Sequence, residues 1–284
     1  SALVSSCNDL ALQAINIPSY LASNHRVKRG LQYGERDHQI LDLYLPAAAR
    51  QSRTRLVVFI HGGAWSSGSR GVYYFVAQAL TAEGYAVAIP DYIKYPRGTF
   101  PTFVTDVAQS ISWLGANIDR YCEVDDLVLM GHSAGAHTGA LLLTDTRYFS
   151  AVGVAHQRIG AFIGLAGPYG FKPKEKKYRD IFANLEDYNQ MRPQHFAHGD
   201  VPPMLLLHGN DDNTVLPHNS ARFAERIVAC GGDARTKFYA GVGHVAPVLA
   251  LSRTPFSHAA IRADIFEFLE TRQGLTGDSA GATA

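Results

Sequence analysis

The feature of this sequence that most constrains its fold is a series of short apolar runs, each ending near a glycine or a proline. Runs that are apolar at every position suit strands buried on both faces, as the central strands of a parallel sheet are. Longer stretches with helical periodicity lie between most of the runs, and this alternation is typical of βαβ units. The five runs span residues 56–60, 85–89, 127–130, 161–166 and 204–207. The sequence therefore predicts an α/β fold around a mostly parallel sheet.

Three further strands and five helices complete the prediction. Residues 236–239 are expected to form the last strand, and the alternating stretches 27–33 and 39–45 predict an N-terminal hairpin. Helices are expected over residues 72–83, 103–120, 134–143, 219–230 and 259–271. We therefore expect a mostly parallel, eight-stranded sheet with helices on both faces and no large cap domain.

Composition limits the domain organisation and the partners. With 284 residues, 46% hydrophobic and 18% charged, the chain can bury a sizeable core in a single domain. The net charge of +1 gives no reason to expect nucleic acid or an anionic membrane surface as a partner. No apolar run is long enough to span a membrane. We expect an N-terminal segment over residues 1–25, one domain over 26–272 and a disordered tail over 273–284.

The three cysteines allow two interpretations each. Cys122 and Cys230 could form a bridge, but two unpaired core thiols are the interpretation we favour. Cys7 ends the stretch Val4-Ser5-Ser6-Cys7, which is similar to the end of a bacterial lipoprotein signal. Lipidation of Cys7 would anchor the protein to a membrane facing the periplasm, whereas a chance cysteine would suit the cytoplasm. The sequence leaves both open.

The stretch Gly131-His132-Ser133-Ala134-Gly135 matches the pattern G-x-S-x-G. It follows a predicted strand and precedes a predicted helix, the context in which this pattern exposes a serine on a sharp turn. Ser133 is therefore the expected nucleophile. The backbone N–H of Ala134 would lie at the helix N-terminus, where negative charge is favoured.

A glycine-containing stretch, His61-Gly62-Gly63-Ala64-Trp65, follows the first apolar run. Acyl transfer builds an oxyanion in the transition state, and backbone N–H groups aimed at it lower the barrier. Glycines let a loop turn its amides toward such a site. We expect Gly63 and Ala64 to act as donors together with Ala134, with Gly62 as an alternative to one of the first two.

Pocket walls are expected from aromatic residues near the strand ends. Trp65 and Tyr169 are candidates for binding the acyl group, and the alternative is that both pack in the core. His61 is expected to orient its loop. Residues 169–201 contain no clear strand, so they form either a lid over the site or a solvated surface excursion.

A carboxylate and a histidine are expected to complete the site. Asp212 fits the spacing H-G-x-x-D-x-x-V that begins at His208, whereas Asp211 suits a turn. His244 lies on a glycine-flanked loop between the last predicted strand and the last predicted helix. We expect Asp212 to orient His244, and His244 to serve as the general base for Ser133.

Together these residues resemble the α/β-hydrolase superfamily over residues 27–272, including the chain order Ser133, Asp212, His244. A closer resemblance is to carboxylesterases with an H-G-G-x-W oxyanion loop, a group that includes kynurenine formamidases and prenylcysteine methylesterases. The stretch 91–107, with Asp91-Tyr92 at its start, also resembles that group. Two departures leave the substrate open: Ile93-Lys94, where many relatives have an arginine, and Ala64, where hormone-sensitive-lipase-like esterases have a glycine.

The resemblance implies a serine hydrolase that cleaves small-molecule carboxylic esters, preferably with short acyl chains, through an acyl-enzyme. It implies no metal and no organic cofactor. Three alternatives remain: an arylformamidase acting on N-formylkynurenine-type amides, a prolyl-oligopeptidase-type peptidase, and a non-catalytic binding protein on the same fold. A peptidase of that type would need additional length for a propeller domain, and a binding protein would usually lack a member of the triad. The sequence does not indicate an oligomeric state.

Overall fold

The structure is a computed structural model that describes residues 14–22, 24–47, 54–155, 158–183, 185–255 and 257–273. The predictions for Cys7 and for residues 274–284 lie outside this part of the chain. Within the expected N-terminal segment, residues 14–21 are helical. Asn16 fastens this helix to the domain by donating to the carbonyls of Gly71 and Val72, both at 3.1 Å.

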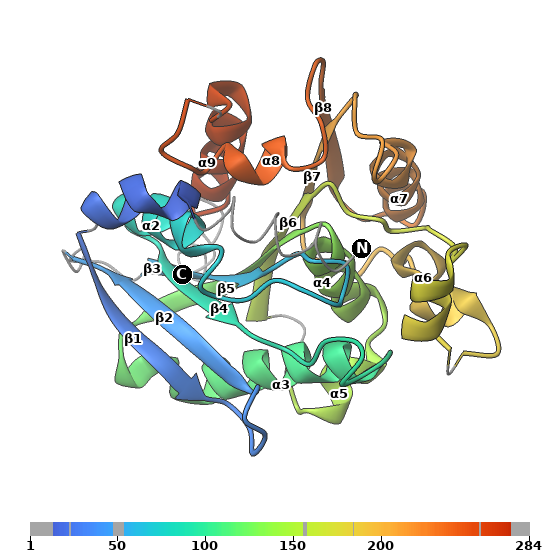
Figure 1. The fold of residues 1–284 in the computed structure, drawn as a ribbon, viewed down its shortest axis with the longest axis horizontal. Helices are drawn as coiled ribbons and strands as arrows, with labels where there is room; N and C mark the ends of the chain where they lie inside the picture. The colour runs from blue at the N-terminus through green and yellow to red at the C-terminus, as the bar shows by residue number, and fades with distance from the viewer. Residues whose placement is uncertain are drawn as a thin grey trace, which may run out of the picture.

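The described residues form one sheet of eight strands in the order β1-β2-β4-β3-β5-β6-β7-β8 (Figure 1). Strand β2 is antiparallel to both its neighbours, and all other pairings are parallel. The strands are β1 (His25–Gln32), β2 (Ile40–Pro46), β3 (Thr54–Ile60), β4 (Ala86–Pro90), β5 (Val124–His132), β6 (Ile159–Leu165), β7 (Met204–Gly209) and β8 (Ala234–Tyr239). The predicted α/β-hydrolase fold with a mostly parallel, eight-stranded sheet is confirmed.

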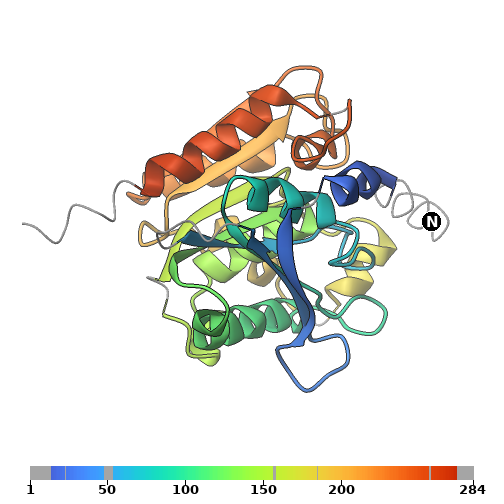
Figure 2. The ribbon, with the colours of Figure 1, turned by 90° about the vertical axis from the view of Figure 1, so that its left-hand side faces the viewer.

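Helices cover both faces of the sheet. They are α2 (Tyr74–Ala82), α3 (Thr102–Asn117), α4 (Ala134–Thr144), α5 (Arg147–Ala151), α6 (Lys176–Ile181), α7 (His218–Ala229), α8 (Ala246–Leu249) and α9 (Ala259–Gln273), with 3₁₀ turns η1 (Ile118–Arg120), η3 (Tyr188–Met191) and η4 (Pro193–His195). Helices α3, α4, α5 and α7 contribute to one core, and α2, α8 and α9 contribute to the other. Figure 2 shows this layering, with α9 and α3 on opposite sides of the sheet. None of the described helices combines the length and the apolar character needed to cross a bilayer.

The two cores follow from the alternation of side chains along each strand. In β3, Leu56, Val58 and Ile60 face the core under α3 and α4, while Val57 and Phe59 face the core under α2. Both sets are fully buried. This is why the runs were apolar at every position rather than at every second one.

Polar residues extend the strands at their N-terminal ends, beyond the apolar runs. Arg55 in β3 forms a two-pronged ion pair with Asp126 in β5, with N–O distances of 2.7 and 2.6 Å. The Arg55 side chain is 2% exposed. The paired charges satisfy one another, so these positions join the sheet although they are not apolar.

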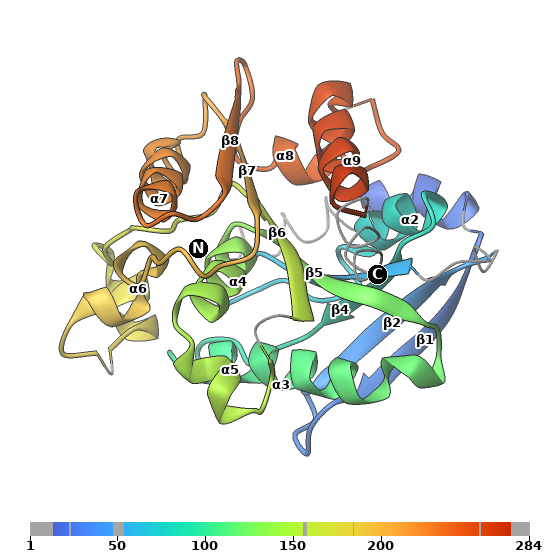
Figure 3. The same cartoon turned by 180° about the vertical axis from the view of Figure 1, so that it is seen from behind.

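The segment between β6 and β7 packs on the body of the domain. It contains α6, η3 and η4, and its Ile181 and Met191 are fully buried. In Figures 1 and 3, α6 lies beside α4 and α7, on the side of the sheet away from β1 and β2. Its lysines at 172, 174 and 176 are exposed. The segment is thus anchored by a buried side rather than being a fully solvated excursion, and it is too small to form a cap domain.

Candidate active site

Ser133 occupies a sharp turn between β5 and α4. Its φ of 53° lies in the left-handed region, which is unfavourable for a residue other than glycine. Its backbone N–H donates to the carbonyl of Leu165 at 2.9 Å, which ties the turn to β6. A Cβ on Gly135 would overlap the carbonyl of Ile60, and one on Gly131 would overlap the backbone of Gly135. Glycine is required at both positions because the helix starts in close contact with the strands.

The structure brings Ser133, His244 and Asp212 into one hydrogen-bonded chain. Ser133 Oγ lies 2.9 Å from His244 Nε2, and His244 Nδ1 lies 2.8 Å from Asp212 Oδ2. The serine follows β5, the aspartate follows β7 and the histidine follows β8, so three strand ends meet here. Asp211 is exposed and lies in the turn after β7, where its N–H donates to the carbonyl of Val242.

The Asp212 carboxylate is buried and fully hydrogen-bonded. Its Oδ1 accepts from the N–H groups of Thr214 and Val215, both at 2.9 Å. Its Oδ2 lies 3.1 Å from His208 Nε2 in addition to its contact with His244. Burial alone would raise the pKa of Asp212, but the hydrogen bonds from His208, His244 and Val215 outweigh it and lower that pKa below its usual range. Asp212 therefore stays ionised beside His244.

Two hydrogen bonds within the His61 loop fix the direction of its amides. We call residues 61–70 the glycine loop. The carbonyl of Gly62 lies 2.8 Å from His61 Nδ1, and the carbonyl of Gly63 accepts from the N–H of Ser67 at 2.9 Å. In a trans peptide the next N–H points opposite to the carbonyl. The N–H groups of Gly63 and Ala64 therefore point away from these internal contacts.

The three backbone N–H groups expected to bind the oxyanion are not engaged within the part of the protein that the structure describes. Among the described residues, no hydrogen bond engages the N–H of Gly63, Ala64 or Ala134. Gly63, Ala64 and Trp65 all have positive φ, at 124°, 51° and 54°. The glycine loop thus holds a conformation that two of its residues disfavour, with donors left unused.

Comparison with known proteins identifies the family. The BD-FAE family model matches residues 41–227, which is more than half of the chain. The chain belongs to the BD-FAE family of α/β-hydrolases.

Two curated relatives and a solved structure show what this chain is similar to. It is 30% identical over 249 residues to an isoprenylcysteine alpha-carbonyl methylesterase of Arabidopsis thaliana, covering 80% of this chain and 58% of that protein. It is 28% identical over 255 residues to Esterase LipC of Mycobacterium tuberculosis, covering 82% and 63%. Esterase B of Lactobacillus rhamnosis has the same fold, with a TM-score of 0.79 at 18% identity over 97% of this chain and 96% of that one. The chain spans little more than half the length of the first curated relatives it matches.

Trp65 and Tyr169 are buried in this BD-FAE protein, in line with the alternative that both pack in the core. Trp65 is 2% exposed and Tyr169 is fully buried. Trp65 stacks on Phe171 at a centroid distance of 5.5 Å and meets Phe182 edge-on at 5.1 Å. Tyr169 turns the other way and stacks on Phe223 of α7 at 4.7 Å. Because the segment after β6 folds down onto the domain, both side chains pack in the core.

Two histidines that sequence analysis did not assign to the site support it. His208 contacts Asp212 and also lies 2.7 Å from Ser220 Oγ through Nδ1. His132 Nε2 donates to the carbonyl of His244 at 3.1 Å. Burial and the neighbouring His244 lower the pKa of His132 to about 3, so it is neutral. In the sequence, His132 is only a variable position of the serine motif, and its contact spans 112 positions.

The described residues also bear on the cysteine and metal predictions. Cys122 and Cys230 are unpaired, as we favoured, but Cys230 is exposed rather than part of the core. Within the same part of the chain, no cluster of three histidine, cysteine or acidic side chains is arranged to hold a metal ion.

Proposed function

We propose that this protein is a serine esterase that hydrolyses carboxylic esters through an acyl-enzyme. The observation that carries the proposal is the continuous chain Ser133 Oγ–His244 Nε2–Asp212 Oδ2, with distances of 2.9 and 2.8 Å. The esterases among its relatives support it. A binding protein would have no use for a strained serine joined through a histidine to a buried, ionised aspartate.

Each residue has a definite task in this mechanism. His244 Nε2 takes the proton of Ser133 as the oxygen attacks the ester carbonyl carbon. The N–H groups of Gly63, Ala64 and Ala134 stabilise the oxyanion of the tetrahedral intermediate. His244 then gives its proton to the departing alcohol, which leaves Ser133 acylated. Finally His244 deprotonates a water molecule that attacks the acyl-enzyme, releasing the acid and restoring the serine. Asp212 stabilises the imidazolium that forms in each half-reaction.

The proposed substrates are esters with short acyl chains. The rings of Trp65, Phe171 and Phe182 pack around His137 of α4, the helix that begins directly after the nucleophile. Because these aromatic side chains fill the space beside the start of α4, they support a binding site for a small acyl group. An apolar pocket gains about 0.8 kcal/mol per buried methylene only as far as its walls reach.

A second candidate is an arylformamidase, which would use the same residues on an N-formyl amide. It is favoured by 34% identity over 142 residues to a kynurenine formamidase of Danio rerio, covering 50% of this chain and 46% of that protein. Rates on N-formylkynurenine and on simple esters, measured side by side, separate the two candidates.

The decisive experiment combines a nucleophile variant with a substrate series. Ser133→Ala should stay folded and lose on the order of 10⁶-fold in kcat on nitrophenyl esters, because the attacking oxygen is gone. Ser112→Ala, on α3, is the matched control and should retain wild-type kcat. In the wild type, kcat/KM should be highest for acetate or butyrate esters and fall through octanoate to palmitate.

Two results would contradict this proposal. A folded Ser133→Ala protein with more than about a hundredth of the wild-type rate would remove Ser133 as nucleophile. A value of kcat/KM that rises continuously to palmitate would show a long acyl groove.

A further inference from the structure

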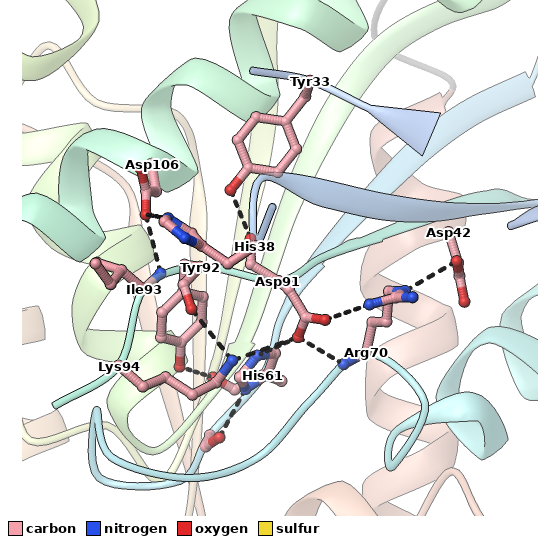
Figure 4. Close-up of polar contacts among 11 residues, drawn as sticks. Tyr33, His38, Asp42, His61, Arg70, Asp91, Tyr92, Ile93, Lys94 and Asp106 are labelled. Atoms are coloured by element: carbon pink, nitrogen blue, oxygen red, sulfur yellow. Dashed lines mark hydrogen bonds and ion pairs between the residues drawn. The ribbon is translucent and has the colours of Figure 1, made fainter. Parts of the chain in front are cut away.

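A buried carboxylate outside the serine–histidine–aspartate chain holds both ends of the glycine loop. Asp91 directly follows β4, and its Oδ1 lies 3.3 Å from His61 Nε2 at the start of the loop (Figure 4). At the end of the loop, the backbone N–H of Arg70 donates to Asp91 Oδ1 at 3.0 Å, and the guanidinium of Arg70 pairs with Oδ2. Lys94 is a third partner, with its Nζ 3.4 Å from Asp91 Oδ1. One side chain thus closes the loop into a ring.

Arg70 extends this link to a second strand. Its Nε lies 3.0 Å from Asp42 Oδ1 in β2, so its planar guanidinium bridges two carboxylates. The Asp42 side chain is 3% exposed and also accepts from the N–H of Gly30 at 2.8 Å. The end of the glycine loop is therefore fixed to the sheet at two points.

The residues after Asp91 hold the start and middle of the loop. The ring of Tyr92 stacks on His61 at a centroid distance of 4.4 Å, and its hydroxyl donates to the carbonyl of His61 at 2.8 Å. The N–H of Tyr95 donates to the carbonyl of Trp65 at 2.9 Å. Residues 91–95 therefore contact the loop along its length.

Residues 91–95 are in turn anchored to α3. Asp106 accepts from the N–H of Ile93 at 2.9 Å and from Gln39 Nε2 at 2.8 Å. His38 Nε2 lies 2.9 Å from the same carboxylate (Figure 4). The glycine loop is thus coupled through residues 91–95 to β2, β4 and α3.

The loop needs such restraint because of its backbone. Ala64 and Trp65 have φ of 51° and 54°, a region that is unfavourable by roughly 1–3 kcal/mol for each residue and persists only where surrounding contacts enforce it. Burial would raise the pKa of Asp91, but the contact with His61 and the positive charges of Lys94 and Arg70 outweigh it and lower that pKa. The Asp91 carboxylate is therefore ionised and can hold both ends of the glycine loop.

We propose that Asp91 and Arg70 are positioning residues that hold the N–H groups of Gly63 and Ala64 in the geometry needed for the oxyanion. The proposal rests on the esterase function proposed above. These donors act in the transition state, so their displacement lowers kcat and leaves ester binding, and hence KM, largely unchanged. A shift of about 1 Å in such a group lowers the rate by about 10²-fold.

The other end of β3 provides a matched control. The Arg55–Asp126 pair joins β3 to β5 through a carboxylate about as buried as that of Asp91, but at the far end of the strand from the glycine loop. Removing one charge there also breaks an arginine–aspartate pair, without touching the loop. If the role of Asp91 were purely structural, breaking either ion pair would change kcat and stability in the same way.

The experiment compares the kcat and KM of Asp91→Asn and Arg70→Gln with those of Asp126→Asn. Nitrophenyl butyrate is the substrate, and the rates are normalised to the concentration of active sites, which is titrated with an organophosphate. The first two should lose about 10²-fold in kcat with little change in KM, while Asp126→Asn lowers the melting temperature and keeps wild-type kcat. Amide hydrogen exchange of residues 61–70 should be faster in the first two variants and unchanged in the third.

The outcomes separate this proposal from the esterase assignment. Wild-type kcat in both loop variants, or an equal loss in Asp126→Asn, would overturn the positioning role. If hydrolysis is absent from the wild type or survives Ser133→Ala, the esterase assignment fails, and the exchange measurement alone decides whether Asp91 and Arg70 hold the loop. Unchanged exchange in that case also overturns the role.

Discussion

Asp212 accepts more hydrogen bonds than the orientation of one histidine requires. Four donors surround it: two backbone N–H groups, His208 and His244. This saturation keeps a buried carboxylate ionised and fixes which oxygen faces His244. Because of these contacts, we expect activity to be sensitive to a substitution of Asp212 that keeps the shape of the side chain and removes its charge.

Asp212→Asn should therefore lower kcat by about 10⁴-fold, because an amide facing His244 Nδ1 favours the wrong tautomer of the imidazole. Asp211→Asn is the matched control at the neighbouring, exposed position and should leave kcat within a factor of about two, as surface changes usually do. Steady-state kinetics of both variants on one ester decide the matter. A larger loss in Asp211→Asn would transfer the role to Asp211.

Sequence predicted the position of Ser133, Asp212 and His244 because each follows a strand in a recognisable local pattern. The positioning role proposed for Asp91 and Arg70 escaped such analysis, since the contacts of Asp91 with His61 and Arg70, and of Arg70 with Asp42, span 21–30 positions. The sequence left the surroundings of Trp65 and Tyr169 open for a similar reason. Their strand-end location was correct, but the direction of each ring depends on how the segment after β6 packs, and no local pattern encodes that.

At the scale of elements, helix α4 is defined by how closely it approaches the sheet. Its first turn lies against the end of β3, where Gly135 faces the Ile60 carbonyl directly. Small residues here are a steric necessity rather than a helix preference, since glycine lowers helix stability by about 1 kcal/mol relative to alanine. At another helical glycine, Gly115 in α3, a Cβ would meet only the Arg158 guanidinium, at an ordinary contact distance of 3.7 Å.

Alanine substitutions at these two glycines should have opposite effects. Gly135→Ala should lower the free energy of unfolding by about 3 kcal/mol, because the new methyl group overlaps backbone atoms that cannot move independently. Gly115→Ala should raise it by about 0.5–1 kcal/mol through helix propensity. Urea denaturation measures both. A neutral Gly135→Ala would mean that α4 and β3 are less tightly packed than described.

The apolar runs located the strands well but underestimated the length of all but β4. In β5 the predicted run of residues 127–130 lies inside Val124–His132. The added positions include Asp126, which is satisfied by Arg55 of another strand. A local pattern of hydrophobicity cannot register a charge whose partner lies 71 positions away.

For the whole molecule, buried neutral histidines link stability to pH. Burial lowers the pKa of His61, and it lowers the pKa of His137 to about 4. The unfolded chain binds these protons near pH 6.5, whereas the folded chain does not. Below that pH the unfolded state is therefore favoured progressively, and stability falls as the pH drops from about 6.5 toward about 4.

His137→Gln should flatten this dependence. His137 contributes a loss of about 2 kcal/mol between pH 8 and pH 5, and glutamine cannot be protonated but can still donate to the Met191 carbonyl that His137 Nε2 contacts at 2.7 Å. The control His218→Gln, at an exposed position, should keep the wild-type slope. Urea denaturation at pH 8, 6.5 and 5 gives the slopes, and an unaltered slope in His137→Gln would show that this histidine is protonated in the folded protein.

The three residues joined at the site follow β5, β7 and β8 in that order along the chain. On the proposed mechanism, a nascent chain gains its nucleophile first, its carboxylate second and its base last. A partly synthesised polypeptide therefore cannot turn over esters, even when most of its sheet has formed. Ester hydrolysis can therefore begin only when the site is fully assembled. The time at which turnover first appears during translation would then mark the time at which β8 joins the sheet.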